Sequence, residues 1–201
     1  QEDQKKKKML IDKLNNYNLI LASKSPRRQE LLKGLGLTFE IKTKEIEEIF
    51  PPALFKEEIP VYLANLKAKA FQEELQENEL VITSDTIVWI DNKQLGKPKD
   101  RSEAIEMLKR LSGKSHEVIT AVTLMSKAKT HSFYETTKVF FKELAQEEIE
   151  YYIDNYQPYD KAGSYGIQEW IGFVGISKIE GDYFNVVGLP LFRLNEELAK
   201  F

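Results

Sequence analysis

A short segment near the N-terminus groups side chains that could bind an anion. Residues 23–28 read SKSPRR and stand between an apolar run, NLILA, and the segment QELLKGLG. Ser25 is a typical N-cap and Pro26 a typical first helical residue, so a helix should begin here. A helix N-terminus presents free N–H groups, and arginine forks bind two phosphate oxygens at once. The alternative is a capped helix with two solvated arginines. The candidate phosphate-binding residues are Ser23, Ser25, Arg27 and Arg28.

Two further polar residues lie next to apolar runs. Asp85 follows LVITS, and an acid at the end of a buried strand can be a metal ligand or a general base, although it can also simply cap a turn. Lys97 lies in LGKP, between a glycine and a proline, so a rigid turn should hold its ammonium as a point charge for phosphate oxygens. A lysine in an exposed hairpin is the alternative.

A glycine-containing turn is predicted at residues 160–168, DKAGSYGIQ. Two close glycines let the backbone approach a ligand, and Lys161 and Gln168 flank them. The amide of Gln168 both donates and accepts, so it could recognise the edge of a base.

An acidic stretch at residues 45–48, EIEE, offers the oxygen ligands that Mg²⁺ or Mn²⁺ prefers. A solvated acidic loop is the alternative. His116 and His131 are too isolated to form a histidine metal site, so we expect them to be structural or exposed.

The bulk composition excludes several classes of protein. The chain has 201 residues, which suits one domain with a sizeable core. The net charge of −3 argues against a nucleic-acid-binding module. The chain has no cysteine, so it has no disulfide and no thiolate metal site. No apolar run approaches the roughly 20 residues that span a bilayer, and no signal peptide is visible. We therefore expect a cytoplasmic protein without a nucleic-acid or membrane partner.

The elements that must position these residues alternate in type, which predicts an α/β fold around a mixed, strongly twisted sheet flanked by helices. An acidic loop or lid is expected at residues 45–60. Strands are expected at residues 18–22, 37–43, 80–83, 86–90, 115–126, 131–144 and 173–181. Helices are expected at residues 10–17, 26–34, 61–76, 102–111, 145–156 and after Pro190.

The first eight residues, QEDQKKKK, are charged and of low complexity. They could form a basic arm for an acidic partner, but a disordered extension or an expression-derived remnant is favoured. We assign residues 1–17 to an N-terminal extension and residues 18–201 to a single domain.

Five segments, taken together, resemble the signature blocks of one family. In order they are LILASKSPRRQELL, SDTIVWIDNKQLGKP, MLKRLSGKSHEVITAV, DKAGSYGIQ and GDYFNVVGLPL. This succession resembles the Maf family of nucleoside triphosphate pyrophosphatases. The resemblance implies a fold related to the inosine triphosphatase group, with a cleft between two lobes. It also implies hydrolysis of a nucleoside triphosphate to the monophosphate and pyrophosphate, with a divalent cation, Mg²⁺ or Mn²⁺.

Carried over by position, the resemblance implies roles for particular residues. Asp85 would be the catalytic proton acceptor and would hold the metal with Glu48, although the alignment could slip to Glu47. The substrate-binding residues would be Ser23, Ser25, Arg27, Arg28, Lys67, Lys97 and Lys161. The residues linked to base selectivity would be Arg27, Thr86 and Gln168.

The block that contains Gln168 resembles the branch that acts on dTTP and UTP, with modified pyrimidine nucleotides as further candidates. Many members have glycine after this glutamine, whereas here Glu169 and Trp170 follow, which leaves the fine specificity open. A nucleotide-binding regulator of cell division or septum formation without turnover is an alternative, and a phosphatase that releases orthophosphate is another. A homodimer is expected from the resemblance alone.

Overall fold

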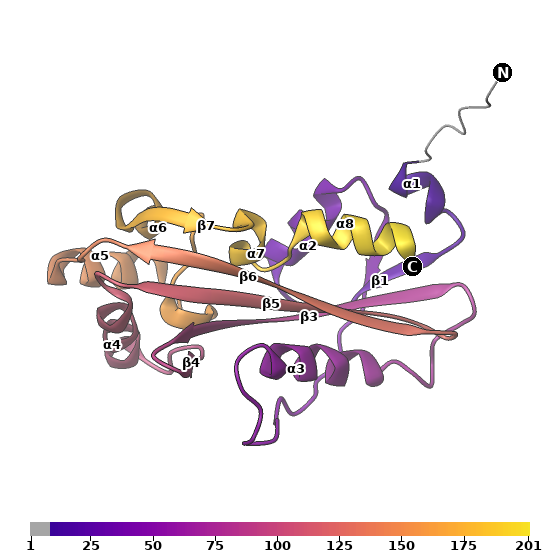
Figure 1. Cartoon of the computed structure of the whole chain (residues 1–201), viewed down its shortest axis with the longest axis horizontal. Coiled ribbons are helices and arrows are strands. Elements are labelled where there is room, and N and C mark those ends of the chain that lie inside the picture. The colour runs from indigo at the N-terminus through magenta and orange to yellow at the C-terminus, as the bar shows by residue number, and fades with distance from the viewer. Residues whose placement is uncertain (1–8) are drawn as a thin grey trace.

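The computed structural model describes residues 9–201, so the interpretation of residues 1–8 as an arm or an extension lies outside the described residues. Long strands cross the whole molecule, and helices cover both sides of them (Figure 1). Among residues 9–201, no helix is long and apolar enough to cross a membrane.

One mixed sheet organises this part of the chain. The strands are β1 (Asn18–Leu21), β2 (Phe39–Ile41), β3 (Glu79–Ile90), β4 (Lys93–Leu95), β5 (Ser115–Ser126), β6 (Thr130–Phe141) and β7 (Ile176–Glu180). They lie in the order β2-β1-β3-β5-β6-β7, and β4 pairs with β3 outside this path. The strand β1 is parallel to β2 and β3, whereas the other pairs are antiparallel. The predicted mixed α/β sheet is confirmed.

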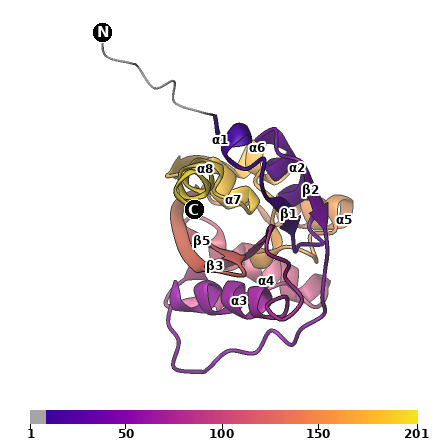
Figure 2. The same cartoon turned by 90° about the vertical axis from the view of Figure 1, so that its right-hand side faces the viewer.

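Helices cover both faces of this sheet. They are α1 (Leu10–Lys13), α2 (Pro26–Gly34), α3 (Glu58–Lys69), α4 (Arg101–Leu111), α5 (Gln146–Tyr156), α6 (Trp170–Gly175), α7 (Tyr183–Val187) and α8 (Leu191–Lys200), with the 3₁₀ turn η1 (Ala162–Ser164). Seen along the long strands, α3 lies on one side of the sheet and α2, α7 and α8 lie on the other (Figure 2).

Local rules account for where the first long helix starts. The Ser25 hydroxyl accepts a hydrogen bond from the backbone N–H of Arg28 at 3.4 Å, and Pro26 is the first helical residue, as predicted. Asp100 caps α4 in the same way, through the N–H of Glu103 at 2.8 Å. The positively charged segment therefore stands at the N-terminus of α2.

Several boundaries differ from the predictions. The helix expected at residues 61–76 begins at Glu58, because Pro60 falls in its first turn, where no N–H is needed. Residues 173–175, expected in a strand, complete α6, and β7 starts only at Ile176. The short helix α7 was not predicted. The expected strand at residues 37–43 is reduced to β2, and the helix at residues 10–17 is reduced to α1.

The prediction of two strands on either side of Asp85 is wrong, because β3 runs through this residue without a break. Its ladder with β5 continues through Ser84, opposite Val122, and Asp85, opposite Ala121. The other edge of β3 is interrupted instead. The register with β1 ends at Ile82, and the register with β4 starts at Val88. In the described chain, residues 83–87 therefore have a strand neighbour on one side only.

Two smaller apolar cores lie against α3. On the opposite face of the sheet, two larger cores occupy opposite ends of the long strands. One contains Val88 and Val118 and is closed by α4 and α5. The other contains Ile82 and Val122 and is closed by α2 and α8. Buried polar residues lie along the middle of β3 and β5, between the strand ends that carry the apolar cores: Thr83, Ser84, Asp85, Thr120 and Thr123. The fold thus has two lobes that share their central strands, and the interrupted edge of β3 lies between them.

One of the two histidines is buried inside the fold. His116, on β5, is 2% exposed, and its Nε2 atom forms a hydrogen bond with the Tyr165 hydroxyl. Its ring stacks on Phe141, with 5.7 Å between the ring centroids. Burial lowers the pKa of His116 to about 3. The structural role expected for this histidine is confirmed.

We predict that this burial destabilises the protein below neutral pH. The unfolded chain protonates His116 near pH 6.5, whereas the folded chain resists protonation until about pH 3. The stabilisation is therefore complete above pH 6.5 and is lost as the pH falls, by up to about 1.4 kcal/mol per pH unit. His116→Gln should flatten the dependence of the free energy of unfolding on pH, measured by urea denaturation between pH 7 and pH 4.5.

The matched control is His131→Gln, at an exposed position, which leaves His116 in place. This variant should keep the acid sensitivity of the parent protein. An unaltered pH dependence in His116→Gln would contradict the assignment.

Candidate active site

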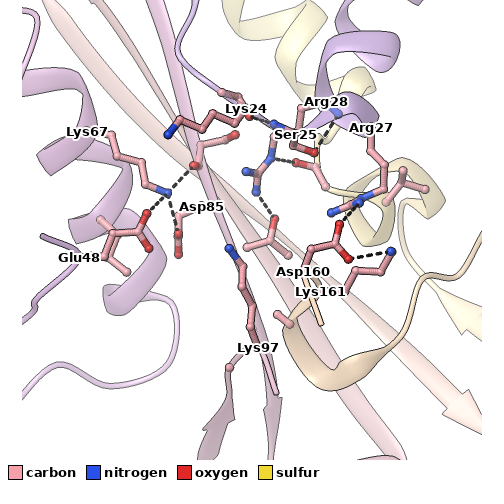
Figure 3. Close-up of a pocket in the computed structure, with 18 of the residues that line it drawn as sticks. Lys24, Ser25, Arg27, Arg28, Glu48, Lys67, Asp85, Lys97, Asp160 and Lys161 are labelled. Carbon is pink, nitrogen blue, oxygen red and sulfur yellow. Dashed lines mark hydrogen bonds and ion pairs between the residues drawn. The ribbon is translucent and has the colours of Figure 1, made fainter. Parts of the chain in front are cut away.

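A cavity of about 760 Å³ opens at the interrupted edge of β3, and both lobes contribute to its wall. Figure 3 shows the charged side chains that converge on it. The structure brings every predicted site residue to this cavity: Ser23, Ser25, Arg27, Arg28, Glu48, Lys67, Asp85, Thr86, Lys97, Lys161 and Gln168.

The alternation of β3 divides the cavity into two groups of side chains. Consecutive strand residues point to opposite faces, so Asp85 faces α3 while Thr86 faces α2. Both side chains reach the cavity because no strand covers this edge of β3 within residues 9–201. In Figure 3, Lys67 and Asp85 form one group and the two arginines belong to the other, with Lys97 extending between them.

The first group is two carboxylates held by one ammonium. Lys67 Nζ lies 3.0 Å from Asp85 Oδ1 and 3.2 Å from Glu48 Oε1, and it also donates to the backbone oxygen of Ser84 at 3.2 Å. Burial raises the pKa of Asp85, and the charge and hydrogen bond of Lys67 oppose that rise. Glu48 lines the cavity and Glu47 does not, so the structure favours Glu48 of these two neighbours.

This pair of carboxylates fits a divalent cation by its chemistry. Mg²⁺ is usually held by one or two carboxylates and shares the oxygens of a substrate phosphate. Glu48 and Asp85 already approach a single positive charge, that of Lys67. Residues 9–201 contain no group of three or more acidic or histidine side chains that could form a complete protein cage. The donor set is therefore one that a phosphate ligand would complete.

The second group is organised around a partly buried arginine, Arg28. Arg28 Nε donates to the backbone oxygen of Gly188 at 2.8 Å, and Nη2 donates to Thr86 Oγ1 at 2.8 Å. Burial lowers the pKa of Arg28, and the nearby charge of Asp85 acts in the opposite direction. Two of its five N–H groups are thus committed to fixed acceptors, which holds the plane of the guanidinium at the cavity wall.

An acidic residue that the sequence analysis missed joins the two lobes. Asp160 Oδ2 lies 3.2 Å from Arg27 Nη1, and its Oδ1 lies 3.0 Å from Lys161 Nζ. Burial raises the pKa of Asp160, but the hydrogen bonds and charges of Lys161 and Arg27 outweigh it, and the net pKa is lowered. The signal was available, because Asp160 is the first residue of DKAGSYGIQ and lies next to Lys161. Asp160 therefore pairs with two cations, Arg27 and Lys161, that an anionic substrate would otherwise contact.

The residues that depart from the family pattern lie behind the cavity wall. Glu169 Oε1 pairs with Lys161 Nζ at 3.0 Å, and Trp170 packs against Tyr151 with 4.7 Å between the ring centroids. Neither Glu169 nor Trp170 lines the cavity. Lys161 is therefore held by two carboxylates, Asp160 and Glu169, at the edge of the site.

The loop that carries Gln168 is fixed by a close backbone contact. Gly163 has φ of 72°, and a Cβ atom there would lie 2.9 Å from a methyl group of Val88. Its N–H donates to the oxygen of Gly96 at 3.1 Å, next to Lys97. Gln168 Oε1 is buried and has no hydrogen-bond partner within the described part of the chain. Gln168 thus lines the cavity in a loop held by these contacts, and its side chain carries an acceptor without a partner in the described chain.

Comparisons with known proteins give one consistent picture. A family model described as Maf-like protein matches residues 18–201. A relative from Flavobacterium johnsoniae, named dTTP/UTP pyrophosphatase, is 54% identical over 191 residues, which are 95% of this chain and 98% of the relative. One of the same name from Flavobacterium psychrophilum is 58% identical over 182 residues, 90% and 93% of the two chains. Among solved structures, the Staphylococcus aureus Ham1 protein matches with 15% identity and a TM-score of 0.43. The match covers 62% of this chain and 71% of the Ham1 chain.

We predict that removal of Lys67 alters the titration of Asp85. Lys67→Met deletes the cation that lowers the pKa of this carboxyl and leaves the burial that raises it. The pKa of Asp85 should therefore rise further, measured by carbon-detected NMR titration of its carboxyl group. At pH 8 Lys67→Met should lower the free energy of unfolding by about 1–3 kcal/mol, because the carboxylate is left unpaired. This loss should shrink as the pH falls and Asp85 becomes protonated.

Lys97→Met is the matched control, because Lys97 lines the same cavity without contacting Asp85. Lys97→Met should leave the pKa of Asp85 unchanged. A fall in the Asp85 pKa in Lys67→Met would refute the pairing.

Proposed function

The chain belongs to the Maf-like protein family, and we propose that it is a nucleoside triphosphate pyrophosphatase that hydrolyses dTTP and UTP. The proposal is carried by the close relatives that bear the name dTTP/UTP pyrophosphatase and are matched over almost their whole length. The cavity supports it, since cations, a buried carboxylate and an amide acceptor meet there. The products would be the nucleoside monophosphate and pyrophosphate.

The triphosphate would lie across the N-terminus of α2. Water attacks the α-phosphorus, the bond to the bridging oxygen breaks, and pyrophosphate leaves with that oxygen. Such a reaction depends mainly on positioning and on neutralising the charge of the phosphates. The residues that would hold the phosphate oxygens are Ser23, Ser25, Arg27, Arg28, Lys67, Lys97 and Lys161.

Asp85 would accept the proton of the attacking water. Burial raises the pKa of this carboxyl, which makes it a stronger base than an exposed aspartate, while the charge of Lys67 favours its ionised form. Glu48 and Asp85 would hold a divalent cation, Mg²⁺ or Mn²⁺, whose charge neutralises phosphate oxygens.

Gln168 would recognise the base. Thymine and uracil share an N3–H donor between two carbonyl oxygens, and a side-chain amide offers the matching acceptor and donor. The buried Oε1 atom of Gln168 lacks a partner among residues 9–201, which supports its assignment as the acceptor for N3–H. Modified pyrimidines that keep this edge would also fit, which supports a house-cleaning role. Arg27 and Thr86 would contribute to selectivity from the other side of the cavity.

The location and assembly follow as further proposals. Nucleoside triphosphates are made and consumed in the cytoplasm, so we place the enzyme there. A homodimer rests on the family resemblance. Nucleic acid is not a proposed partner, because the chain carries a net charge of −3.

The decisive assay is product analysis on a panel of nucleoside triphosphates, with Mg²⁺, Mn²⁺ or EDTA. We expect metal-dependent release of pyrophosphate and monophosphate from dTTP and UTP. Asp85→Asn should lower kcat by about 100-fold or more, because the proton acceptor is lost. Asp91→Asn, in the exposed turn between β3 and β4, is the control and should turn over normally.

Other products would identify other functions. Binding of dTTP without turnover would favour the nucleotide-binding regulator, and release of orthophosphate would identify a phosphatase. Near-normal turnover by Asp85→Asn would remove this residue from the chemistry.

We predict that Gln168 sets the base preference. Gln168→Ala should reduce kcat/KM for dTTP and UTP by about 10-fold or more and should affect CTP less, because polar groups of the correct base lose their partner. The measurement is the ratio of kcat/KM values across the nucleotide panel. Gln94→Ala, at another glutamine of the cavity wall, is the control and should keep the ratio. If Gln168→Ala leaves the ratio of the kcat/KM values for dTTP and CTP unchanged, the assignment of Gln168 to base recognition is wrong.

A further inference from the structure

A chain of hydroxyl groups lies behind the partly buried Arg28. Thr86 on β3 and Thr120 on β5 face each other directly across the antiparallel ladder, and their Oγ1 atoms are 2.8 Å apart. Thr86 Oγ1 also contacts Arg28, and Thr120 Oγ1 also contacts the backbone oxygen of Asn185 at 3.0 Å. Thr120 is fully buried and does not line the cavity, so it cannot touch the substrate itself.

The direction of each hydrogen bond in this chain can be assigned. A backbone carbonyl only accepts, so the single hydroxyl hydrogen of Thr120 goes to Asn185. Thr86 must then donate to Thr120. A guanidinium only donates, so Thr86 accepts from Arg28. Every hydroxyl hydrogen is used, and the free orientation of the Thr86 hydroxyl is removed.

The far end of the chain is anchored in the fold. The Nδ2 atom of Asn185, in α7, lies 3.1 and 3.2 Å from the backbone oxygens of Val118 and Glu135 and 3.1 Å from Thr137 Oγ1, so its two hydrogens are shared among three acceptors. These contacts attach α7 to β5 and β6. Gly188, just after α7, supplies the second acceptor of Arg28. Both acceptors of the arginine are therefore set by the position of α7, one directly and one through the two threonines.

We propose that Thr120 is a positioning residue for the triphosphate site, which it serves by holding the Thr86 hydroxyl as the acceptor that orients Arg28. This inference rests on the proposed function and extends it. In place of the part in base selectivity given to Thr86 above, it assigns this residue an action on the phosphate chain through Arg28, because its hydroxyl is committed to Arg28 and Thr120. Small errors of position at a reacting group are costly, since a displacement of about 1 Å can reduce a rate about 100-fold.

The test is a set of variants at Thr120 that separates the hydroxyl from side-chain volume. Thr120→Val and Thr120→Ala lack the hydroxyl, whereas Thr120→Ser keeps it. We expect Val and Ala to raise KM for dTTP, UTP and CTP and Ki for inorganic tripolyphosphate by a common factor of about 10. We expect Ser to stay within about twofold of the parent protein, and the base preference to stay unchanged in all three.

A matched control and a coupling experiment exclude a merely structural effect. Thr123 is also fully buried on β5, and its Oγ1 lies 2.9 Å from Ser132 Oγ, away from Arg28. Thr123→Val should bind tripolyphosphate as the parent protein does. In an Arg28→Ala background, Thr120→Val should have no further effect on tripolyphosphate binding, because the group it orients is absent.

Four results would overturn the proposal. The first is that Thr120→Val binds tripolyphosphate as tightly as Thr123→Val does, and the second is that Thr120→Ser binds it as weakly as Thr120→Ala does. The third is that Thr120→Val still has its full effect on tripolyphosphate binding in the Arg28→Ala background. The fourth is that the Thr120 variants change only the base preference. If thermal unfolding shows that Thr120→Val is not folded, the Ser and Ala variants decide. Calorimetric binding of tripolyphosphate needs no turnover, so an inactive parent protein would refute the pyrophosphatase function and leave this comparison intact.

Discussion

The interruption of one edge of β3 is the constraint on which the site depends. The parallel pairing with β1 stops at Ile82 and the hairpin with β4 starts at Val88, so the backbone between them borders a cavity instead of a strand. An open strand edge presents unpaired carbonyl groups, and here Lys67 binds one of them, that of Ser84. Because residues on a strand alternate, this single edge presents Asp85 to one group of charges and Thr86 to another.

The site balances its positive charges with its own carboxylates. A cavity for a triphosphate must collect cations, and these repel one another at close range. Lys67 is paired with Glu48 and Asp85, and Arg27 with Asp160. Substrate and metal would replace such internal pairs with equivalent ones, so binding need not desolvate bare charges. The same burial that raises the pKa of Asp85 lowers that of Arg28, and each limits the shift of the other.

Buried polar groups join the site to the stability of the fold. The two larger apolar cores share β3, β5 and β6, so the lobes are not independent bodies, and the cleft lies over continuous strands. The hydroxyl pair of Thr86 and Thr120 crosses this junction. In a low-dielectric interior such a network is rigid when every group is satisfied, and it is costly when one group is lost. Positioning of the arginine and packing of the lobes therefore depend on the same few residues.

The sequence by itself determined the features that local chemistry encodes. Ser25 and Pro26 predicted where α2 begins, the strand periodicity predicted the two long strands β5 and β6, and the motif residues all reached one cavity. Only the tertiary structure decided that β3 is continuous through Asp85 and open at its edge. It also brought Gly188 to Arg28, 160 positions away, and Asp160 to Arg27, 133 positions away. Propensity and spacing act over a few residues, whereas register and partner choice depend on packing between distant segments.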